Sequence, residues 1–257
     1  MIKSIQIRNI TIGTGTPKIC VPIIGKTRDE ILQSASDINS TKHDLVEWRV
    51  DWYKDVLNPA SVSEVLSQLR NILGDTPILF TFRTKAEGGE LEISKEEYLK
   101  LNLDAIKTNY IDLVDVELFT GDDLVNTVIE EAHKLDIKVV VSSHDFERTP
   151  AKKELLTRLQ RMQNLGADIP KLAVMPVDKA DVITLLSATE EMNTNYADRP
   201  IVTMSMDKIG VISRICGELF GSSITFGSAS GASAPGQIPA DELYELINQL
   251  HKYFKKN

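Results

Sequence analysis

Short apolar segments alternate with amphipathic segments along the chain. Eight of the apolar segments are rich in β-branched and aromatic residues, and most are bounded by Gly, Pro, Asn or Asp, which predicts buried β-strands. These segments are residues 18–24, 44–53, 77–84, 110–118, 138–146, 169–175, 200–206 and 222–228.

The segments between the predicted strands carry apolar residues at three- and four-residue steps, which predicts amphipathic helices. Clear examples are residues 27–39, 61–73, 94–107, 122–135 and, for the last helix, 240–254. Ser94 and Glu97 match the S-x-x-E pattern of a capping box at the start of the third of these helices.

Eight strand-then-helix units predict parallel strands joined by right-handed crossovers. In a chain of 257 residues, eight such units favour a closed (β/α)8 barrel, the TIM barrel of the α/β class, over an open sheet. We therefore expect a single barrel domain over residues 1–257. Residues 5–13 (IQIRNITIG) precede the first barrel strand, and we expect them to form a short β-hairpin, with Asn9 near its turn, that closes the barrel bottom.

Charge and composition narrow the range of partners. The net charge of −8 disfavours a general nucleic-acid or acidic-membrane binder but allows a small anionic ligand held by local arginines. Cys20 and Cys216 form no C-x-x-C pattern, which predicts buried thiols in a reducing compartment. No apolar run near the N-terminus suits a signal peptide or a membrane span, so we expect a soluble, cytoplasmic protein.

The second predicted strand divides into an apolar and a charged face. The apolar face holds Val46, Trp48, Val50 and Trp52, and the charged face holds Glu47, Arg49 and Asp51. Because the tryptophans favour packing against helices, we expect the charged face to point into the barrel. Charges there must pair with each other or face a polar ligand. Salt bridges at an exposed edge are the alternative.

Polar residues also mark the ends of the next three strands, where barrel enzymes carry their chemistry. Arg83 ends the third strand, Glu87 follows it in a Gly-bearing loop, and His144 lies near the end of the fifth. Histidine is the usual proton carrier near neutral pH, so His144 is a candidate general acid or base, with a structural histidine as the alternative. Asp115 and Glu117 share one face of the fourth strand. No metal triad is visible, and magnesium held by these two carboxylates is the remaining metal hypothesis.

Lys171 stands at the head of an apolar run that predicts a buried strand. Burial and nearby cations favour the neutral amine, which can attack a ketone or an aldehyde and form a Schiff base. A lysine at a strand start with its head in solvent is the alternative. Lys171 lies near the beginning of its strand, whereas barrel sites lie at the ends, so we expect its long stem and the strand stagger to close the gap.

The last third of the chain adds an arginine and a loop of small residues. Arg214 falls on the helix predicted after the seventh strand, with its first turn near residues 208–210, and a guanidinium there suits a planar carboxylate. Residues 228–238 predict a loop that covers the substrate, in which Ser233 and Gln237 are able to hydrogen-bond hydroxyls. A phosphate cradle and an ordinary flexible loop are the alternatives. The absence of G-x-G-x-x-G and Walker patterns argues against a nucleotide.

Six segments in order, spread over most of the chain, carry a family resemblance. They are EWRVDWY (47–53), FTFRTKAEGGE (80–90), VVVSSHDFERTP (139–150), IPKLAVMP (169–176), TMSMDKIGVISRICGELFGSSITFGS (203–228) and ASAPGQIP (232–239). Together they resemble the type I 3-dehydroquinate dehydratases. The resemblance implies a (β/α)8 barrel, a homodimer without cofactor, and removal of water from 3-dehydroquinate to give 3-dehydroshikimate in the shikimate pathway of aromatic amino-acid biosynthesis.

The resemblance also implies roles by position in the matching motifs. Lys171 is implied as the Schiff-base lysine, His144 as the general acid and base, and Glu87 as the group that assists beside His144. Arg214 is implied to bind the substrate carboxylate. The residues implied to hold the ring hydroxyls and order the lid are Glu47, Arg49, Arg83, Ser233 and Gln237, and those implied to form apolar walls are Met204 and Phe226. Pro22 departs from the family pattern where some members have a serine, which puts a contact from the first strand in doubt.

Two other functions stay open at this point. A class I aldolase would use the same lysine to break a carbon–carbon bond of a keto sugar. A barrel without activity would serve as a ligand sensor or interaction module. The joint presence of Glu87, His144, Lys171 and Arg214 argues against the second, because a binder needs no acid or base beside a nucleophile.

Overall fold

Within residues 2–229 and 234–254, which the computed structural model of the chain describes, eight parallel strands form the central sheet. The strands are β3 (Lys18–Ile23), β4 (Leu45–Arg49), β5 (Ile78–Thr81), β6 (Leu113–Glu117), β7 (Lys138–Asp145), β8 (Ile169–Val174), β9 (Val202–Ser205) and β10 (Ile224–Ser228). They pair in chain order, and β10 pairs with β3. A bridge between Ile201 and Ser222 joins β9 to β10, so the sheet closes into a barrel, and the short β11 (Ile238–Pro239) pairs with the outer end of β10.

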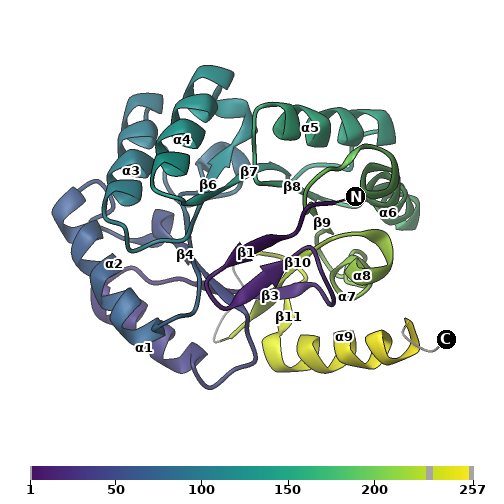
Figure 1. Cartoon of the computed structure of the whole chain (residues 1–257), viewed down its shortest axis with the longest axis horizontal. Coiled ribbons are helices and arrows are strands. Elements are labelled where there is room, and N and C mark those ends of the chain that lie inside the picture. Colours follow the sequence, from purple (N-terminus) through teal and green to yellow (C-terminus); the bar gives the residue numbers. More distant parts are fainter. Residues whose placement is uncertain (1, 230–233, 255–257) are drawn as a thin grey trace.

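Helices surround the ring of strands (Figure 1). They are α1 (Arg28–Ile38), α2 (Pro59–Leu73), α3 (Lys95–Lys107), α4 (Asp122–Lys134), α5 (Lys152–Asn164), α6 (Lys179–Glu191), α7 (Ile212–Ile215), α8 (Gly217–Phe220) and α9 (Ala240–Phe254). Ser94 accepts a hydrogen bond from the backbone of Glu97 and the Glu97 side chain reaches back, so the predicted capping box is present. The predicted TIM barrel is confirmed.

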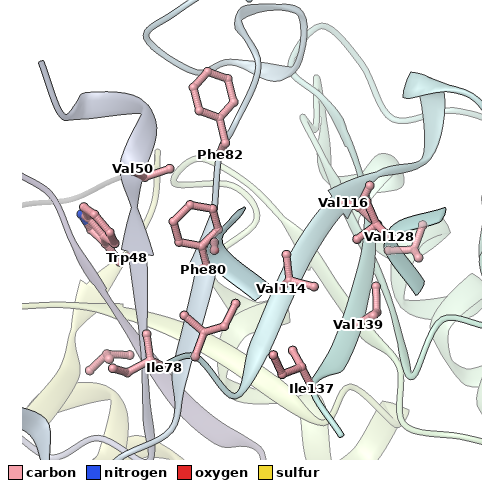
Figure 2. Close-up of a cluster of buried hydrophobic side chains, with 14 of the residues drawn as sticks. Trp48, Val50, Ile78, Phe80, Phe82, Val114, Val116, Val128, Ile137 and Val139 are labelled. Atoms are coloured by element: carbon pink, nitrogen blue, oxygen red, sulfur yellow. The ribbon is translucent and has the colours of Figure 1, made fainter. Parts of the chain in front are cut away.

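The main core lies between the outer face of the barrel and the helices. Figure 2 shows Trp48, Phe80, Val114 and Val139 from four adjacent strands in one apolar layer, joined by Val128 of α4. Trp48 meets Phe80 edge to face at 5.7 Å between ring centroids, an arrangement that adds to the burial of both rings. Because strand side chains alternate, this outward apolar face turns the intervening residues, such as Glu47, into the lumen.

A β-hairpin closes the lower end of the lumen, as the sequence predicts. The strands β1 (Ile5–Ile7) and β2 (Ile10–Ile12) pair antiparallel around Arg8 and Asn9, and β1 crosses the barrel opening in Figure 1. The hairpin places Ile7, Ile10 and Ile12 in a second apolar cluster, together with residues from the lower ends of the barrel strands, namely Cys20, Leu45, Leu79, Leu113, Ile169 and Ile224. The polar residues of the lumen therefore lie above an apolar floor.

Two sequence predictions need correction. The second strand ends at Arg49 and passes into a 3-10 turn, Val50–Trp52, so Asp51 is not a strand residue. The reason is local, because Asp51 folds back and receives two hydrogen bonds from the Arg49 guanidinium. The helix predicted from residues 208–210 begins at Ile212 and is split into α7 and α8, since Cys216 interrupts it.

Candidate active site

A cavity opens at the C-terminal ends of the barrel strands, where barrel enzymes carry their sites. Ten of the eleven site residues expected from the sequence line it. They are Glu47, Arg49, Arg83, Glu87, His144, Lys171, Met204, Arg214, Phe226 and Gln237. The eleventh, Ser233, lies outside the described residues.

Lys171 is the third residue of β8, and its side chain is only 5 % exposed. Its Nζ lies 3.3 Å from Oδ2 of Asp115 and 3.5 Å from Oε1 of Glu47. The Phe226 ring lies on another side, 4.5 Å from Nζ to the ring centroid. In the pairing of β7 with β8, Ala173 lies opposite His144, and Lys171 lies two residues before Ala173. The side chain of Lys171 therefore starts below the level of His144 and extends up to the site, which agrees with the prediction from the sequence.

His144 and Glu87 form a buried acid–base pair. Oε2 of Glu87 accepts a hydrogen bond from the backbone N–H of His144 at 2.9 Å, and the same oxygen lies 2.9 Å from Nδ1. Burial, the nearby Glu117 and a further carboxylate raise the pKa of Glu87 to about 8. Burial and the charges of Arg83 and Lys171 hold the pKa of His144 well below its usual value. The pair therefore shares one titratable proton near neutral pH, and Nε2 is the ring nitrogen left for a substrate.

Glu87 owes its position to a tight turn after β5. Residues Lys85–Glu87 form a 3-10 turn that ends at Gly88, whose φ of +85° favours glycine. A Cβ on Gly89 would lie 1.9 Å from the carbonyl oxygen of Arg83, so the turn has no room for a larger residue. The Gly-bearing loop of the sequence is thus what brings the carboxylate back over the barrel.

Arg83 is engaged by carboxylates. NH2 donates to Asp115 at 2.9 Å and NH1 donates to Glu117 at 2.9 Å, with Glu87 3.6 Å from NH1. NH1 also donates to Ser142. A guanidinium therefore sits between the two carboxylates that were a candidate magnesium site. Among residues 2–229 and 234–254, no group of three or more His, Cys, Asp or Glu side chains is arranged to hold a metal ion.

Arg49 is held in a fixed orientation by Asp51. The carboxylate receives Nε and NH2 of Arg49, each at 2.8 Å, which is the bidentate geometry of an arginine–carboxylate pair. Asp51 also accepts weaker hydrogen bonds from the backbone N–H groups of Arg83 and Glu90. One buried carboxylate thus connects the ends of β4 and β5 to the turn that carries Glu87.

Arg214 is 1 % exposed and lies under the segment that follows β10. Its NH2 group donates to the carbonyl oxygen of Pro235 at 2.9 Å, and within the described part of the chain its buried Nε has no hydrogen-bond partner. Burial lowers the pKa of Arg214 to about 10, so the side chain stays cationic at neutral pH. An unpaired donor on a buried cation at the cavity wall suits an anionic ligand. Ala234 and Gln237 of the same segment line the cavity.

Sequence reasoning missed two large wall residues, Phe146 and Met206, which also line the cavity. A signal was present, because each lies two residues beyond a residue already predicted, His144 or Met204, and so shares its face. Pro22 is buried on β3 in register with Glu47. Within the described ranges, no helix combines the length and apolar character needed to cross a membrane.

Comparisons with known proteins agree with this geometry. The family model described as type I 3-dehydroquinase matches residues 19–254. A 3-dehydroquinate dehydratase of Clostridioides difficile is 53 % identical over 252 residues, which cover 98 % of this chain and 99 % of the relative. A crystal structure of a type I 3-dehydroquinate dehydratase from Clostridium difficile, with covalently modified comenic acid, superposes with a TM-score of 0.96, is 53 % identical and covers 98 % of this chain and 100 % of its own.

A second solved structure agrees at lower identity. The 3-dehydroquinate dehydratase from Enterococcus faecalis is 44 % identical, with a TM-score of 0.90, and the match covers 95 % of this chain and 98 % of that one. The shared fold, the full-length similarity and the matched family model lead to one conclusion: this chain belongs to the type I 3-dehydroquinase family.

Proposed function

We propose that this chain is a hydro-lyase that removes water from 3-dehydroquinate to give 3-dehydroshikimate, through an imine between Lys171 and the substrate ketone. The observation that carries the proposal is that a buried lysine, a histidine–carboxylate pair and a buried arginine line one cavity. Family membership supports the substrate, and the covalently modified ligand of the C. difficile relative supports covalent chemistry in the family.

The first half of the reaction forms the imine. The neutral amine of Lys171 adds to the C3 ketone, and the carbinolamine then loses water, leaving a cationic iminium on Nζ. His144 protonates the departing hydroxyl from Nε2, since Glu87 engages Nδ1. Arg214 binds the substrate carboxylate, and this contact fixes which ring carbon faces the imidazole.

The second half removes the C2 proton and the C1 hydroxyl. The iminium withdraws electrons, so the C2 proton becomes acidic enough for neutral His144 to take it and leave an enamine. The enamine expels the C1 hydroxyl, which leaves as water with the proton held by His144. The Glu87–His144 pair suits both steps because it gains or loses its shared proton near pH 8. Hydrolysis of the iminium then releases the product and frees Lys171.

The remaining wall residues hold the substrate. Arg49, Glu47 and Gln237 line the cavity and supply donors and acceptors for ring hydroxyls. The buried Phe226 and Met204 give apolar contact to the ring. Arg83 lines the same cavity, but its terminal N–H groups already donate to protein carboxylates, so we assign its main effect to the electrostatics of the site. The homodimer and the cytoplasmic location stay predictions.

The proposal is tested by trapping the imine. Purified protein is treated with sodium borohydride in the presence of 3-dehydroquinate, and the intact mass and the modified peptide are measured. We expect one reduced adduct on Lys171, no adduct in Lys171→Ala, and an unchanged adduct in Lys100→Ala, which removes an exposed lysine of α3. An unmodified wild-type protein that still forms product would disprove the imine route.

Product analysis separates this function from its rivals. A dehydratase gives a conjugated carboxylate that absorbs in the ultraviolet and keeps all ring carbons. A class I aldolase would form the Lys171 adduct with a keto sugar and cleave that sugar into two smaller carbon fragments. A non-catalytic barrel would bind 3-dehydroquinate without any absorbance change.

A further inference from the structure

Asp115 lies behind the reacting nitrogen and is fully buried on β6. Its Oδ2 lies 3.3 Å from Nζ of Lys171, and its Oδ1 accepts hydrogen bonds from NH2 of Arg83 at 2.9 Å and from the Ser142 hydroxyl at 2.6 Å. Asp115 is not among the residues that line the cavity within the described ranges. It therefore contacts the nucleophile and not the substrate ring.

The surroundings of Asp115 favour the carboxylate form. Burial alone would raise the pKa of Asp115, but the charges of Arg83 and Lys171 and the hydrogen bonds from Ser142 and Arg83 hold it below its usual value. Glu117, on the same strand, faces the same guanidinium from the other side. Asp115 consequently keeps its negative charge next to Nζ of Lys171.

Glu47 is the other carboxylate near Nζ, and it is placed differently. It lies at 3.5 Å, lines the cavity, and accepts a hydrogen bond from the Thr81 hydroxyl. Glu47 is therefore exposed to the substrate, whereas Asp115 is shielded from it by the lysine. Apart from Lys171, the two carboxylates have different hydrogen-bond partners, and of the two it is Asp115 that accepts a hydrogen bond from an arginine among the described residues.

The reaction places a positive charge at Nζ in the iminium on either side of the elimination. The neutral amine, the ketone and the proton supplied by His144 give R–NH2 + O=CR2 + H⁺ → R–NH⁺=CR2 + H2O, so the charge that the proton brings stays on the iminium nitrogen. Removal of the C2 proton by His144 makes the neutral enamine, and loss of the C1 hydroxyl restores the iminium. A fixed anion beside nitrogen stabilises each cationic form and opposes loss of the iminium proton.

We propose that Asp115 is a catalytic counter-ion that keeps the imine nitrogen protonated and so maintains its power to withdraw electrons. The inference rests on the proposed function, since it needs the imine on Lys171. It assigns to Arg83 and Ser142 the positioning of that counter-ion. It also explains why a buried lysine is accompanied by a carboxylate that no substrate group reaches.

The test compares two buried carboxylates of the same network. Asp115→Asn removes the charge next to Nζ with little change in shape. Glu117→Gln makes the same change on the other side of Arg83, where Glu117 bonds Arg83 and Thr84 and makes no ion pair with Lys171 among the described residues. Circular dichroism and thermal unfolding establish that both variants fold.

We expect Asp115→Asn to lower kcat by about 10- to 100-fold and to move the basic limb of the kcat–pH profile down by about 1–2 pH units, because a cation that loses its anion loses its proton more easily. KM for 3-dehydroquinate should change by less than about threefold, since Asp115 does not line the cavity. Asp115→Glu, which keeps the charge, should restore the position of the basic limb. Glu117→Gln should move that limb less than Asp115→Asn does, because Glu117 acts on the pKa of Glu87 and not on Nζ of Lys171.

Two results would disprove the role of Asp115 as a counter-ion. One is a basic limb unmoved in Asp115→Asn, and the other is an equal shift in Glu117→Gln, which would mean that both residues act only by holding Arg83. If Asp115→Asn does not fold, Ser142→Ala gives the second measurement. Loss of the serine hydrogen bond should make Asp115 easier to protonate and move the acidic limb of kcat to higher pH, and an unmoved acidic limb would contradict the proposal.

The outcome is separable from that of the proposed function. Borohydride trapping on the wild-type protein tests the imine alone. If the wild type and Asp115→Asn both give the Lys171 adduct and their basic limbs coincide, the imine stands and the counter-ion fails. If the wild type gives product without an adduct, both proposals fail together.

Discussion

Glu87 and His144 meet at a single oxygen: Oε2 of the glutamate lies 2.9 Å from both the backbone nitrogen and the Nδ1 of the histidine. The backbone hydrogen bond fixes where the carboxylate sits, and the ring contact fixes which way the imidazole turns. The proton carrier is therefore oriented by a residue of the turn that follows β5, 57 positions earlier in the chain.

Replacement of the proton carrier should separate imine formation from turnover. His144→Ala leaves Lys171 in place, so the borohydride adduct should still form, while kcat falls by about 10²–10⁴-fold, the usual contribution of general acid–base catalysis. His133→Ala is the control, because His133 lies at the surface and bonds Asp168. Near-native turnover in His144→Ala, measured by product absorbance, would remove His144 from the mechanism.

The acid–base pair should also make stability depend on pH. The pKa of Glu87 is raised to about 8 in the folded chain from an ordinary value of 4.5, so the folded state holds a proton that the unfolded state releases. This contribution is fully present below about pH 4.5 and is lost as the pH rises toward 8. The pKa of His144 is lowered, which opposes the effect only below its ordinary value of 6.5.

Between pH 6.5 and 8 the carboxyl group thus acts alone within this pair. We expect the free energy of unfolding of the wild type to fall relative to Glu87→Gln by on the order of 1–2 kcal/mol across this window. Urea titrations of both proteins at several pH values measure the difference. Parallel curves for the two proteins would show that Glu87 titrates at an ordinary pKa.

The buried arginine should be sensitive to its shape as well as its charge. Arg214→Lys keeps the cation but removes the planar donor set that suits a carboxylate, so KM should rise by about 10- to 100-fold, the loss expected for a charged hydrogen bond. Arg28→Lys is a matched control at an exposed pair with Glu64. An unchanged KM in Arg214→Lys would place the substrate carboxylate elsewhere.

The hairpin floor should matter for stability more than for chemistry. Ile12→Ala creates a cavity at a fully buried position and should cost about 2–5 kcal/mol of unfolding free energy, with kcat kept within about twofold. Ile183→Ala, at a position 67 % exposed, is the control and should change stability by less than about 0.5 kcal/mol. A large loss of kcat in folded Ile12→Ala would mean that the floor also positions the site.

Much of the fold is readable from the sequence because its physical causes are local. The alternation around Trp48 and Glu47 identifies a two-sided strand, and the helix of residues 240–254 ends where its apolar period ends. The end of the second strand is not predicted correctly, because the hydrogen-bonded pair of Arg49 and Asp51 bends the chain there. The periodicity of apolar residues carries no information about such a side-chain hydrogen bond. The break between α7 and α8 is a similar case: a Cβ on Gly217 would lie 2.8 Å from the carbonyl oxygen of Ser222, and the apolar period of the segment does not indicate this close approach.

The site was predicted mainly through family resemblance, and the partners of each residue were not. Sequence spacing places Lys171 on an inward face but does not say that its nearest charges are Asp115 and Glu47. The resemblance implies that Arg83 holds substrate hydroxyls, and sequence spacing does not show that two carboxylates of the neighbouring strand accept hydrogen bonds from its guanidinium. Such pairings depend on barrel stagger, which sets which residues share a level and is not written in any one segment.

The isoleucine floor under the barrel has a consequence for exchange with solvent. Ile7, Ile10 and Ile12 seal the lower end, so the upper mouth is the route by which reactant enters and by which both the product and the eliminated water depart. Substrate and product therefore pass through the same opening, beside which Arg214 donates a hydrogen bond to the carbonyl oxygen of Pro235. Arg214, to which we assign the binding of the substrate carboxylate, therefore also lies on the path by which the product carboxylate leaves.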